Sequence, residues 1–264
     1  MTVLAIANQK GGVGKTTTAI SLSAALAERG RSVLLVDLDP QSSATLSLGV
    51  DLEQVEATAY QSLVDREDEG PEPLANAVIS LGGGLSLVPA TIDLAAADLD
   101  LMAQMDRERA LRAALAPLRE RYDVVIIDCP PSLGLLTINA LTAATGVIVP
   151  VQTDYLSVRG ASLLVTKTLG RVRRKLNPDL QLVGILAAIH DGRTGHAREV
   201  LEGLREAFGE TLFDTVIKYT VRFRDAAAEG HSILSHPRAG DIADSYRALA
   251  TEVLLRVEAT RVSV

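Results

Sequence analysis

Short, continuous runs of apolar residues alternate along the chain with longer stretches in which apolar residues recur at helical spacing. The first apolar run covers residues 3–7, and a helical pattern follows over residues 16–29. A second apolar run, residues 33–36, comes directly after that helical pattern. Strands that are buried on both faces read as continuous apolar runs. The opening of the chain therefore predicts a strand–loop–helix–strand unit, which implies a parallel sheet.

The same alternation continues through the rest of the sequence. Further strands are predicted over residues 85–88, 124–127, 147–151, 182–189 and 213–217, and helices over about 93–105, 107–121, 158–175, 196–208 and 241–259. Residues 65–73 are rich in acids and proline, and we expect a surface loop there rather than a linker. The pattern indicates one α/β domain over residues 1–264, with a doubly wound, mostly parallel sheet flanked by helices.

Composition removes several classes of protein. The 264 residues are 47% hydrophobic and 22% charged, which is typical of a soluble globular protein. Cys129 is the single cysteine, so neither an intrachain disulfide framework nor a cysteine-rich zinc site can form. The first residues lack the pattern of a secretory signal, and no window reaches the ~18 apolar residues of a membrane span. We expect a cytoplasmic protein that does not insert in a membrane.

Charge is distributed unevenly over a chain whose net charge is −7. Residues 1–132 carry 10 Lys and Arg against 19 Asp and Glu, a net charge of −9. Residues 133–264 carry 16 against 14, a net charge of +2. A surface that binds a polyanion would therefore be local and would lie in the second half.

A glycine-rich loop stands between the first predicted strand and the first predicted helix. Its sequence, KGGVGKTT, covers Lys10, Gly11, Gly12, Val13, Gly14, Lys15, Thr16 and Thr17. A loop in this position presents backbone N–H groups and a helix N-terminus to phosphates. Lys15 would neutralise the β- and γ-phosphates of a nucleotide, and the Thr16 hydroxyl would bind Mg²⁺.

The loop departs from the standard P-loop because Gln9 stands where the first glycine is expected and Lys10 precedes the glycine pair. In this it resembles the deviant Walker A loop of the ParA/MinD/nitrogenase iron protein ATPases. The resemblance implies that ATP and Mg²⁺ are the ligands and that Lys10 reaches across a homodimer interface to the nucleotide of the partner subunit. A second cation supplied in this way would make dimerisation depend on ATP, much as an arginine finger acts on a transition state.

Acids follow two of the predicted strands, as they do in this family. Asp37 and Asp39 end the second strand, and Asp128 follows the run at residues 124–127. The resemblance implies that Asp39 positions the attacking water, that Asp37 lies near the metal, and that Asp128 is the Walker B aspartate that holds Mg²⁺. The carboxyl ends of parallel strands are also where open α/β sheets bind ligands. A single acid at a strand end is often only a helix N-cap, and this alternative stays open for Asp37.

Three further segments are similar to those of the short ParA/Soj chromosome- and plasmid-partitioning ATPases. They are VPVQ at 149–152, HDGRT at 190–194 and VRFRDA at 221–226. The resemblance implies that Arg193 and Arg222 bind DNA without sequence preference, because arginine–phosphate contacts supply affinity but no specificity. Arg224 and Lys218 would extend this surface, and the basic run at 171–175 is a further candidate that is as readily explained as a solvated helix end.

The resemblance implies an ATP-dependent partitioning switch. The ATP-bound homodimer would bind non-specific double-stranded DNA on the nucleoid, and a ParB-type centromere-binding protein would stimulate slow basal hydrolysis and so release it. A helix-turn-helix domain is not expected, since the P-loop begins at residue 10. The alternatives are a MinD/FlhG-like positioning ATPase that acts on a membrane or polar partner, and a metabolic P-loop enzyme. Cys129 alone could not supply the cluster ligands of a nitrogenase iron protein, and Glu258 in a final segment without bulky aromatics argues against membrane docking.

Overall fold

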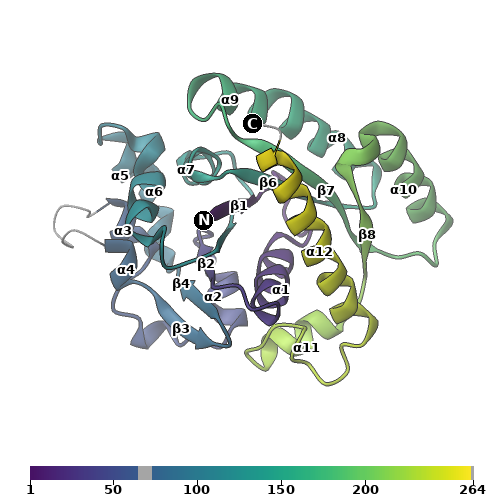
Figure 1. Cartoon of the computed structure of the whole chain (residues 1–264), viewed down its shortest axis with the longest axis horizontal. Coiled ribbons are helices and arrows are strands. Elements are labelled where there is room, and N and C mark those ends of the chain that lie inside the picture. The colour runs from purple at the N-terminus through teal and green to yellow at the C-terminus, as the bar shows by residue number, and fades with distance from the viewer. Residues whose placement is uncertain (65–72, 263–264) are drawn as a thin grey trace.

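The computed structural model describes residues 1–64 and 73–262, so most of the loop expected at 65–73 lies outside the described residues. Within that part, eight strands form one sheet in the order β3-β4-β2-β5-β1-β6-β7-β8 (Figure 1). All neighbouring strands are parallel except β3 and β4, which form an antiparallel pair at one edge. The strands are β1 Thr2–Ile6, β2 Val33–Asp37, β3 Ile79–Gly82, β4 Leu85–Val88, β5 Val124–Asp128, β6 Gly146–Gln152, β7 Gln181–His190 and β8 Leu212–Lys218. The predicted fold class is confirmed.

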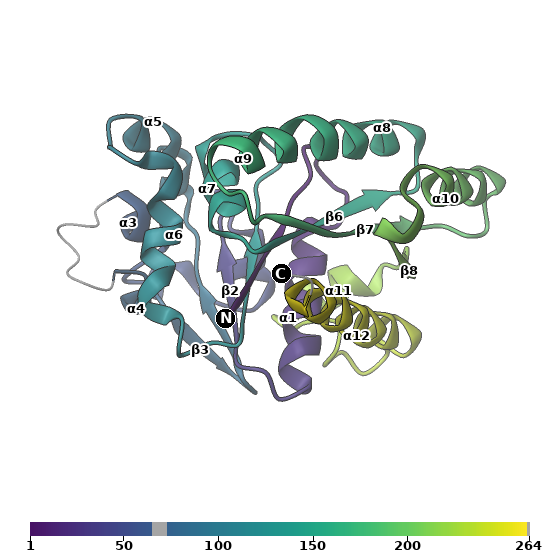
Figure 2. The same ribbon diagram turned by 45° about the horizontal axis from the view of Figure 1, so that its top comes forward.

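Helices cover both faces of this sheet (Figures 1 and 2). The α-helices are α1 Lys15–Glu28, α2 Ser43–Ser47, α3 Ala59–Val64, α4 Pro73–Asn76, α5 Ala97–Met102, α6 Ala110–Leu115, α7 Leu135–Ala143, α8 Tyr155–Leu163, α9 Gly170–Lys175, α10 Gly195–Phe208, α11 Arg222–Ala228 and α12 Asp241–Val262. A π-helical segment, Leu164–Leu169, joins α8 to α9, and short 3₁₀ turns extend several of the other helices. No helix of the described chain is both long enough and apolar enough to cross a lipid bilayer.

The buried apolar residues described here fall into two clusters, one on each face of the sheet. One contains residues of α3, α5, α6, α7, α9 and α10, and the other contains residues of α1, α2, α11 and α12. The strands contribute alternate residues to the two clusters: Val3 and Ala5 of β1 lie in the first, whereas Leu4 and Ile6 lie in the second. This is the two-residue period of a strand that is buried on both faces.

The same alternation fixes the direction of two acids. In β5, Val124 and Ile126 belong to the cluster around α1, and Asp128 follows them at the same period. Asp37 has the corresponding position in β2, and it is the register partner of Asp128 in the parallel pair of strands. Both carboxylates therefore point to the face that α1 covers.

Some elements differ from those that the sequence predicts. The helix expected over 158–175 begins at residue 155 and changes to π-helical geometry at 164–169. The helices expected over 93–105 and 107–121 are short α-helical and 3₁₀ pieces. β3 and the helices α2, α3, α4, α7 and α11 have no counterpart in the sequence prediction. The polar residues of α7, which are Thr137, Asn139 and Thr142, are buried together with most of its apolar residues, so it lacks the exposed polar stripe by which a surface helix is recognised.

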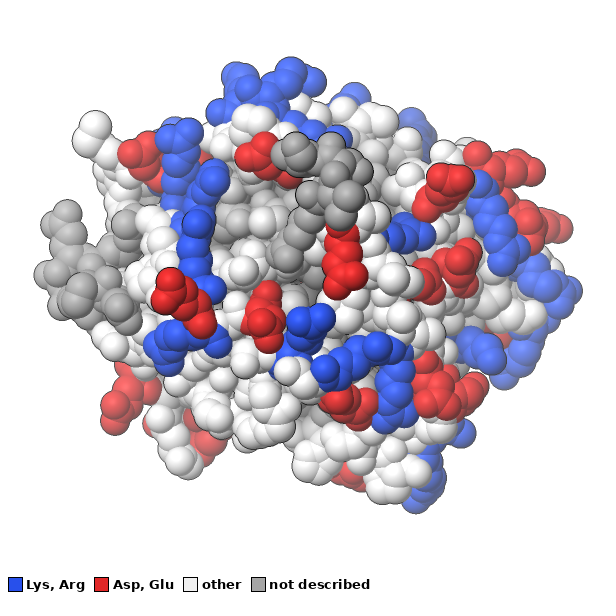
Figure 3. All heavy atoms as spheres, viewed as in Figure 1, with Lys and Arg blue, Asp and Glu red and all other residues white. Residues whose placement is uncertain are grey.

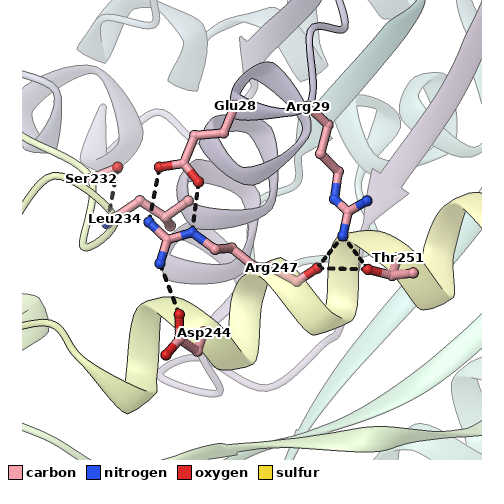
Figure 4. Close-up of polar contacts among 7 residues, drawn as sticks. All are labelled: Glu28, Arg29, Ser232, Leu234, Asp244, Arg247 and Thr251. Atoms are coloured by element: carbon pink, nitrogen blue, oxygen red, sulfur yellow. Dashed lines mark hydrogen bonds and ion pairs between the residues drawn. The ribbon is translucent and has the colours of Figure 1, made fainter.

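Helix α12 connects α1 to strand β8. Figure 4 shows Arg247 of α12 between two acids, donating to Glu28 of α1 at 2.7 and 3.1 Å and to Asp244 at 2.9 Å. Arg29, just beyond α1, donates to the carbonyl of Arg247 at 3.2 Å. Further along α12, Glu252 accepts the N–H groups of two β8 residues at 3.0 and 2.9 Å. One helix is thus bound both to the helix that follows the glycine-rich loop and to the edge strand.

Two glycines bring the end of α2 against the end of α11. Gly49 and Gly230 both have left-handed backbones, with φ of 73° and 75°. A Cβ on Gly49 would lie 3.3 Å from the Cα of Gly230, and a Cβ on Gly230 would lie 3.0 Å from the Cα of Gly49. Neither position has space for a side chain, and each also needs the backbone freedom of glycine.

Candidate nucleotide-binding site and basic edge

The glycine-rich loop leaves the central strand β1 and enters α1 with its backbone turned outward. Gly12 and Gly14 adopt left-handed conformations, with φ of 71° and 86°. Gly14 is the N-cap of α1 and provides no side-chain cap, so the first N–H groups of the helix are available to a ligand. Gly11 and Gly12 are exposed, whereas Val13 is fully buried and anchors the loop. The half-buried Thr16 and Thr17 lie in the first turn of α1. This is the geometry of a phosphate-binding loop.

Lys15 is the first residue of α1, and its side chain is buried. Only 6% of the residue is exposed, and Nζ donates to the carbonyl of Lys10 at 3.3 Å. Burial lowers the pKa of Lys15, while the charges of Asp128 and Asp39 act in the opposite direction. The loop therefore holds a cation within electrostatic reach of the acids that follow β5 and β2.

Asp128 is fully buried, and its carboxylate oxygens make no hydrogen bond of ordinary geometry in the described chain, although the Thr16 hydroxyl is close enough to lower its pKa. Burial, and then the charge of Asp37, raise the pKa of Asp128 well above its usual range. An orphaned buried carboxylate is costly unless a cation satisfies it. Beside the Thr16 hydroxyl, it fits a Mg²⁺ ion that takes its remaining ligands from water and phosphate. The described residues contain no group of three or more His, Cys, Asp or Glu side chains that could hold a metal alone.

Asp37 is bound by the chain itself. Its Oδ2 accepts the N–H and the hydroxyl of Thr45 in α2 at 2.9 and 2.8 Å, and its Oδ1 accepts the N–H of Asp39 at 3.1 Å. Burial raises the pKa of Asp37 to about 6, although the hydrogen bonds from Thr45 oppose the shift. The carboxylate thus binds an N–H group in the first turn of α2 from the neighbouring strand, although the N-cap residue of α2 is Ser42 and not Asp37. Its part in metal binding stays a prediction.

Asp39 is buried, with 8% exposed, and its Oδ1 accepts the N–H of Gln41 at 3.0 Å. This bond closes a turn after β2 and does not cap α2, which begins at Ser43. The second oxygen, Oδ2, makes no hydrogen bond that involves another described residue. A carboxylate so held could accept a hydrogen bond from water at the phosphate end of the site.

Lys10 points away from Lys15. Its Nζ lies 2.6 Å from Oδ2 of Asp154 and 2.9 Å from Oγ of Ser157, both at the start of α8. Asp154 is also the N-cap of α8, since its Oδ1 accepts the N–H of Ser157 at 2.8 Å. Although partial burial opposes the shift, hydrogen bonds from Lys10 and Ser157 lower the pKa of Asp154. Sequence analysis did not single out Asp154 or Ser157; their spacing signals a helix start but not its contact with residue 10.

The candidate DNA-binding residues gather at the β8 edge of the sheet. Arg193 follows β7 and Lys218 ends β8, and the register partner of Lys218 is His190. Arg222 and Arg224 lie in α11, which comes directly afterwards. Arg193 is thus brought to the same edge as three predicted residues that lie at least 25 positions later in the sequence.

The basic run at 171–175 lies on the face of the sheet opposite to that of Arg222 and Arg224. It lies in α9, and Val172 packs in the cluster on the face opposite to that of α11, where Ala226 is buried. Figure 3 shows Lys and Arg side chains gathered at the upper end of the molecule, where Figure 1 places α9, whereas positive and negative side chains alternate over α1 and α12. This arrangement separates 171–175 from Arg222, whereas α10, which follows Arg193, shares a face with α9, so a DNA-binding role of the run stays a prediction.

Known proteins share both the sequence and the fold. A family model described as an AAA domain matches residues 1–182. The sporulation initiation inhibitor protein Soj of Bacillus subtilis is 43% identical over 251 residues, 95% of this chain and 97% of that protein. The chromosome-partitioning ATPase Soj of Thermus thermophilus is 48% identical over 255 residues, 97% of this chain and 96% of that protein. A structure described as cobyrinic acid a,c-diamide synthase from Mycobacterium smegmatis, with bound ATP analog and magnesium, superposes with a TM-score of 0.84 at 41% identity, over 98% of this chain and 96% of that one.

Proposed function

The chain belongs to the ParA/Soj family of chromosome-partitioning ATPases, and from this premise we propose that it is an ATP-dependent DNA-partitioning switch. ATP and Mg²⁺ bind at the glycine-rich loop, and the ATP-bound form is a homodimer that binds DNA without sequence preference. Hydrolysis, slow in the isolated protein and stimulated by a ParB-type partner, releases the dimer from DNA. The protein acts in the cytoplasm on the nucleoid and uses no membrane.

The observation that carries this proposal is the different placement of two lysines in one loop. Lys15 is buried beside the acids at the strand ends, whereas Lys10 lies outside the loop on Asp154. Lys15 binds the β- and γ-phosphates of the nucleotide in its own subunit. Lys10 leaves Asp154 and reaches the nucleotide of the partner subunit, so that a stable dimer requires ATP in both subunits.

The remaining groups of the site have separate roles in hydrolysis. Thr16 and Asp128 hold Mg²⁺, which neutralises charge on the phosphates when it is bound. Asp37 supports this pair from the neighbouring strand by fixing α2 through Thr45. Asp39 orients the attacking water with its free oxygen. The buried carboxylate of Asp128 supports this assignment, because a cation bound between it and the Thr16 hydroxyl would offset its buried charge.

The basic edge supplies the DNA contacts. Arg193, Arg222, Arg224 and Lys218 contact phosphates, which gives affinity without sequence readout. Dimerisation doubles the number of these contacts on one DNA molecule and so raises the avidity without any new type of contact. Nucleotide state thereby controls where the protein resides.

A metabolic function is the second candidate, because the Mycobacterium smegmatis structure is described as a diamide synthase. Such an enzyme would turn over ATP only with a small-molecule substrate and would ignore DNA. The relatives described as partitioning proteins, 40–48% identical over nearly the whole chain, favour the switch. A positioning ATPase of the MinD kind would instead bind lipid vesicles in the presence of ATP.

The test is DNA binding measured with no nucleotide, with ADP and with ATP, each with Mg²⁺ and over a series of salt concentrations. The switch predicts tight binding with ATP alone, with an affinity that falls steeply as salt rises. Arg222→Ala should weaken binding on every DNA sequence about equally while ATP binding persists. DNA affinity that is the same in all three nucleotide states would remove the proposal.

A further inference from the structure

Acidic residues of the same chain form ion pairs with cations of the basic edge. Asp241, the first residue of α12, lies between two of them: its Oδ2 is 3.5 Å from Nζ of Lys218, and its Oδ1 is 3.8 Å from Nη1 of Arg222. Asp191 holds Arg193 in a two-pronged contact, with both nitrogen–oxygen distances at 2.7 Å. Among the predicted DNA-binding residues, Arg224 alone has no ion pair to another residue of the described chain.

These ion pairs do little for the stability of the fold. The side chains of Asp241 and Lys218 are 63% and 64% exposed, and the two contacts of Asp241 are long. Exposed pairs of this kind contribute little to folding, because water and salt screen the attraction and both side chains lose freedom. Their effect on a polyanion is larger, because a phosphate that approaches Lys218 or Arg222 meets the negative charge of Asp241 at short range.

The position of Asp241 is held by the rest of α12. The helix is fixed to α1 through Arg247 and Glu28, and to β8 through Glu252. Asp241 therefore stays beside the basic edge when the side chains of Lys218 and Arg222 turn towards a ligand. Asp191 is likewise fixed, since its carbonyl oxygen accepts the N–H and the hydroxyl of Thr194 at the start of α10.

We propose that Asp241 and Asp191 are intramolecular competitors of the DNA phosphates and set the affinity of the basic edge. This inference rests on the proposed DNA-binding function. Each phosphate contact must displace a carboxylate from its cation, so the single edge of a monomer binds DNA weakly. The two edges of the ATP-bound dimer together overcome the same competition. The acids thus weaken DNA binding in both states, and the monomer, which has a single edge and no avidity, is the state that they leave with little bound DNA.

The competition also affects how the DNA affinity depends on salt concentration. A carboxylate beside a cation offsets part of the positive charge that the cation presents to DNA, so the contact releases fewer of the counterions condensed on DNA than an unpaired cation would release. Removing the carboxylate should therefore raise the affinity at low salt and make it fall more steeply as salt rises. If Asp241 had a purely structural role, its removal would neither raise the affinity for DNA at low salt nor make the affinity fall more steeply with salt.

The experiment compares Asp241→Asn with the wild-type protein in Mg-ATP, on one DNA duplex and over a range of salt concentrations. We expect the variant to bind about three- to tenfold more tightly at low salt, with a steeper salt dependence and an unchanged affinity for ATP. Asp191→Asn should change DNA affinity in the same direction. The matched control is Glu120→Gln, which removes one charge at an exposed position that makes no ion pair in the described structure.

Each outcome separates this inference from the function on which it rests. Wild-type protein that binds DNA only with ATP, together with an Asp241→Asn variant of equal or lower affinity, would overturn the inference and leave the switch intact. An equal gain from Glu120→Gln would also overturn it, because net charge alone would then explain the effect. The proposed function itself would be overturned if the wild-type protein did not bind DNA in any nucleotide state and the Asp241→Asn and Asp191→Asn variants did not bind it either.

Discussion

Asp37 and Asp39 stand two positions apart, yet the chain uses their carboxylates differently. Asp37 accepts three hydrogen bonds from the chain, whereas Asp39 accepts one and keeps an oxygen free. Sequence places both acids at the end of a buried strand, because the apolar run stops there. It does not reveal that Thr45, in the following helix, donates two hydrogen bonds to Asp37. That bond depends on how the turn after β2 folds back, which strand periodicity does not encode.

Removal of the Asp39 carboxylate should stop hydrolysis without preventing ATP binding. Asp39→Ala leaves the glycine-rich loop and Lys10 intact but loses the group that orients water, which typically costs ~10²–10⁴ in rate. The variant should accumulate as an ATP-bound dimer that stays on DNA. Single-turnover hydrolysis and the melting temperature, measured on the same sample, check this result.

Asp39→Asn is the matched control, because its amide oxygen can still accept the Gln41 N–H. It should keep the wild-type melting temperature and hydrolyse as slowly as Asp39→Ala. If it turned over ATP normally, the Asp39 carboxylate would have only the turn-forming role, and the water would be held by another group.

The raised pKa of Asp37 makes stability depend on pH in a specific window. The folded pKa is about 6, whereas an unfolded aspartate titrates near 3.9. Between these values the folded protein binds more protons than the unfolded chain, so the free energy of unfolding should fall as pH rises from about 4 to about 6. The loss is on the order of 2–3 kcal/mol and is complete above pH 6. Urea unfolding of the nucleotide-free protein at a series of pH values measures it.

Asp37→Asn cannot titrate and serves as the comparison. Its unfolding free energy should be lower overall, since the amide nitrogen cannot accept the Asp39 N–H, but it should lack this component of the pH dependence. Parallel pH profiles for the two proteins would show that Asp37 does not change protonation in this range.

At the level of elements, the sequence predicts what is buried and misses what is short or irregular. The central strands β1, β2, β5 and β6 are apolar except at their ends, and their predicted positions agree with the structure within two residues. β3 is four residues long, lies at an edge and alternates between half-buried and exposed positions. Its pairing depends on β4 rather than on its own pattern. Likewise, no pattern of apolar residues distinguishes the π-helical turns from the α-helices beside them.

Asp154 stabilises a helix end and holds Lys10, and these two roles can be separated. Asp154→Ser removes the negative charge that pairs with Lys10. It keeps an N-cap oxygen for α8, so its melting temperature should stay near that of the wild type. Asp154→Ala loses both and should be less stable by ~0.5–2 kcal/mol. If Lys10 must leave Asp154 to reach the partner subunit, both variants should dimerise at lower ATP concentrations. Light scattering during an ATP titration measures this, and an unchanged or higher requirement for ATP would contradict it.

The whole molecule brings the predicted nucleotide site together for a topological reason. β1, β2 and β5 are neighbours in a parallel sheet, so the residues that follow them meet at one edge. This much follows from the order of strands and helices in the sequence. The contact of Lys10 with α8, and that of Asp241 with the basic edge, join segments more than 140 and about 20 residues apart. Such side-chain contacts depend on the packing of whole helices and have no local signal.

Gly11 offers a test of the dimer that leaves the single subunit undisturbed. It is exposed, its backbone is not left-handed, and a Cβ there would meet nothing within 4 Å. Gly11→Val should therefore bind ATP and melt like the wild type, yet fail to dimerise if two such loops face each other. Analytical ultracentrifugation with ATP checks the assembly. ATP-dependent dimers of normal affinity would mean that the loops do not meet across the interface.

Gly12→Val is a less direct probe, although its site is equally open. Its backbone has a φ of 71°, which a β-branched residue adopts only with strain. A defect in that variant would combine damage to the loop with loss of the interface, and comparison with Gly11→Val separates the two effects.

The contact between Gly49 and Gly230 constrains the evolution of the chain. Because each glycine occupies the space that a side chain on the other would need, neither position can change first without displacing α2 or α11. A saturation mutagenesis screen for function should therefore score both positions as intolerant of every other residue. They would be as invariant as the residues of the glycine-rich loop, although neither is proposed to touch a nucleotide or DNA. Intolerance at this pair would reflect the close contact of the two backbones. From a map of essential residues alone, the pair could be misinterpreted as a second active site.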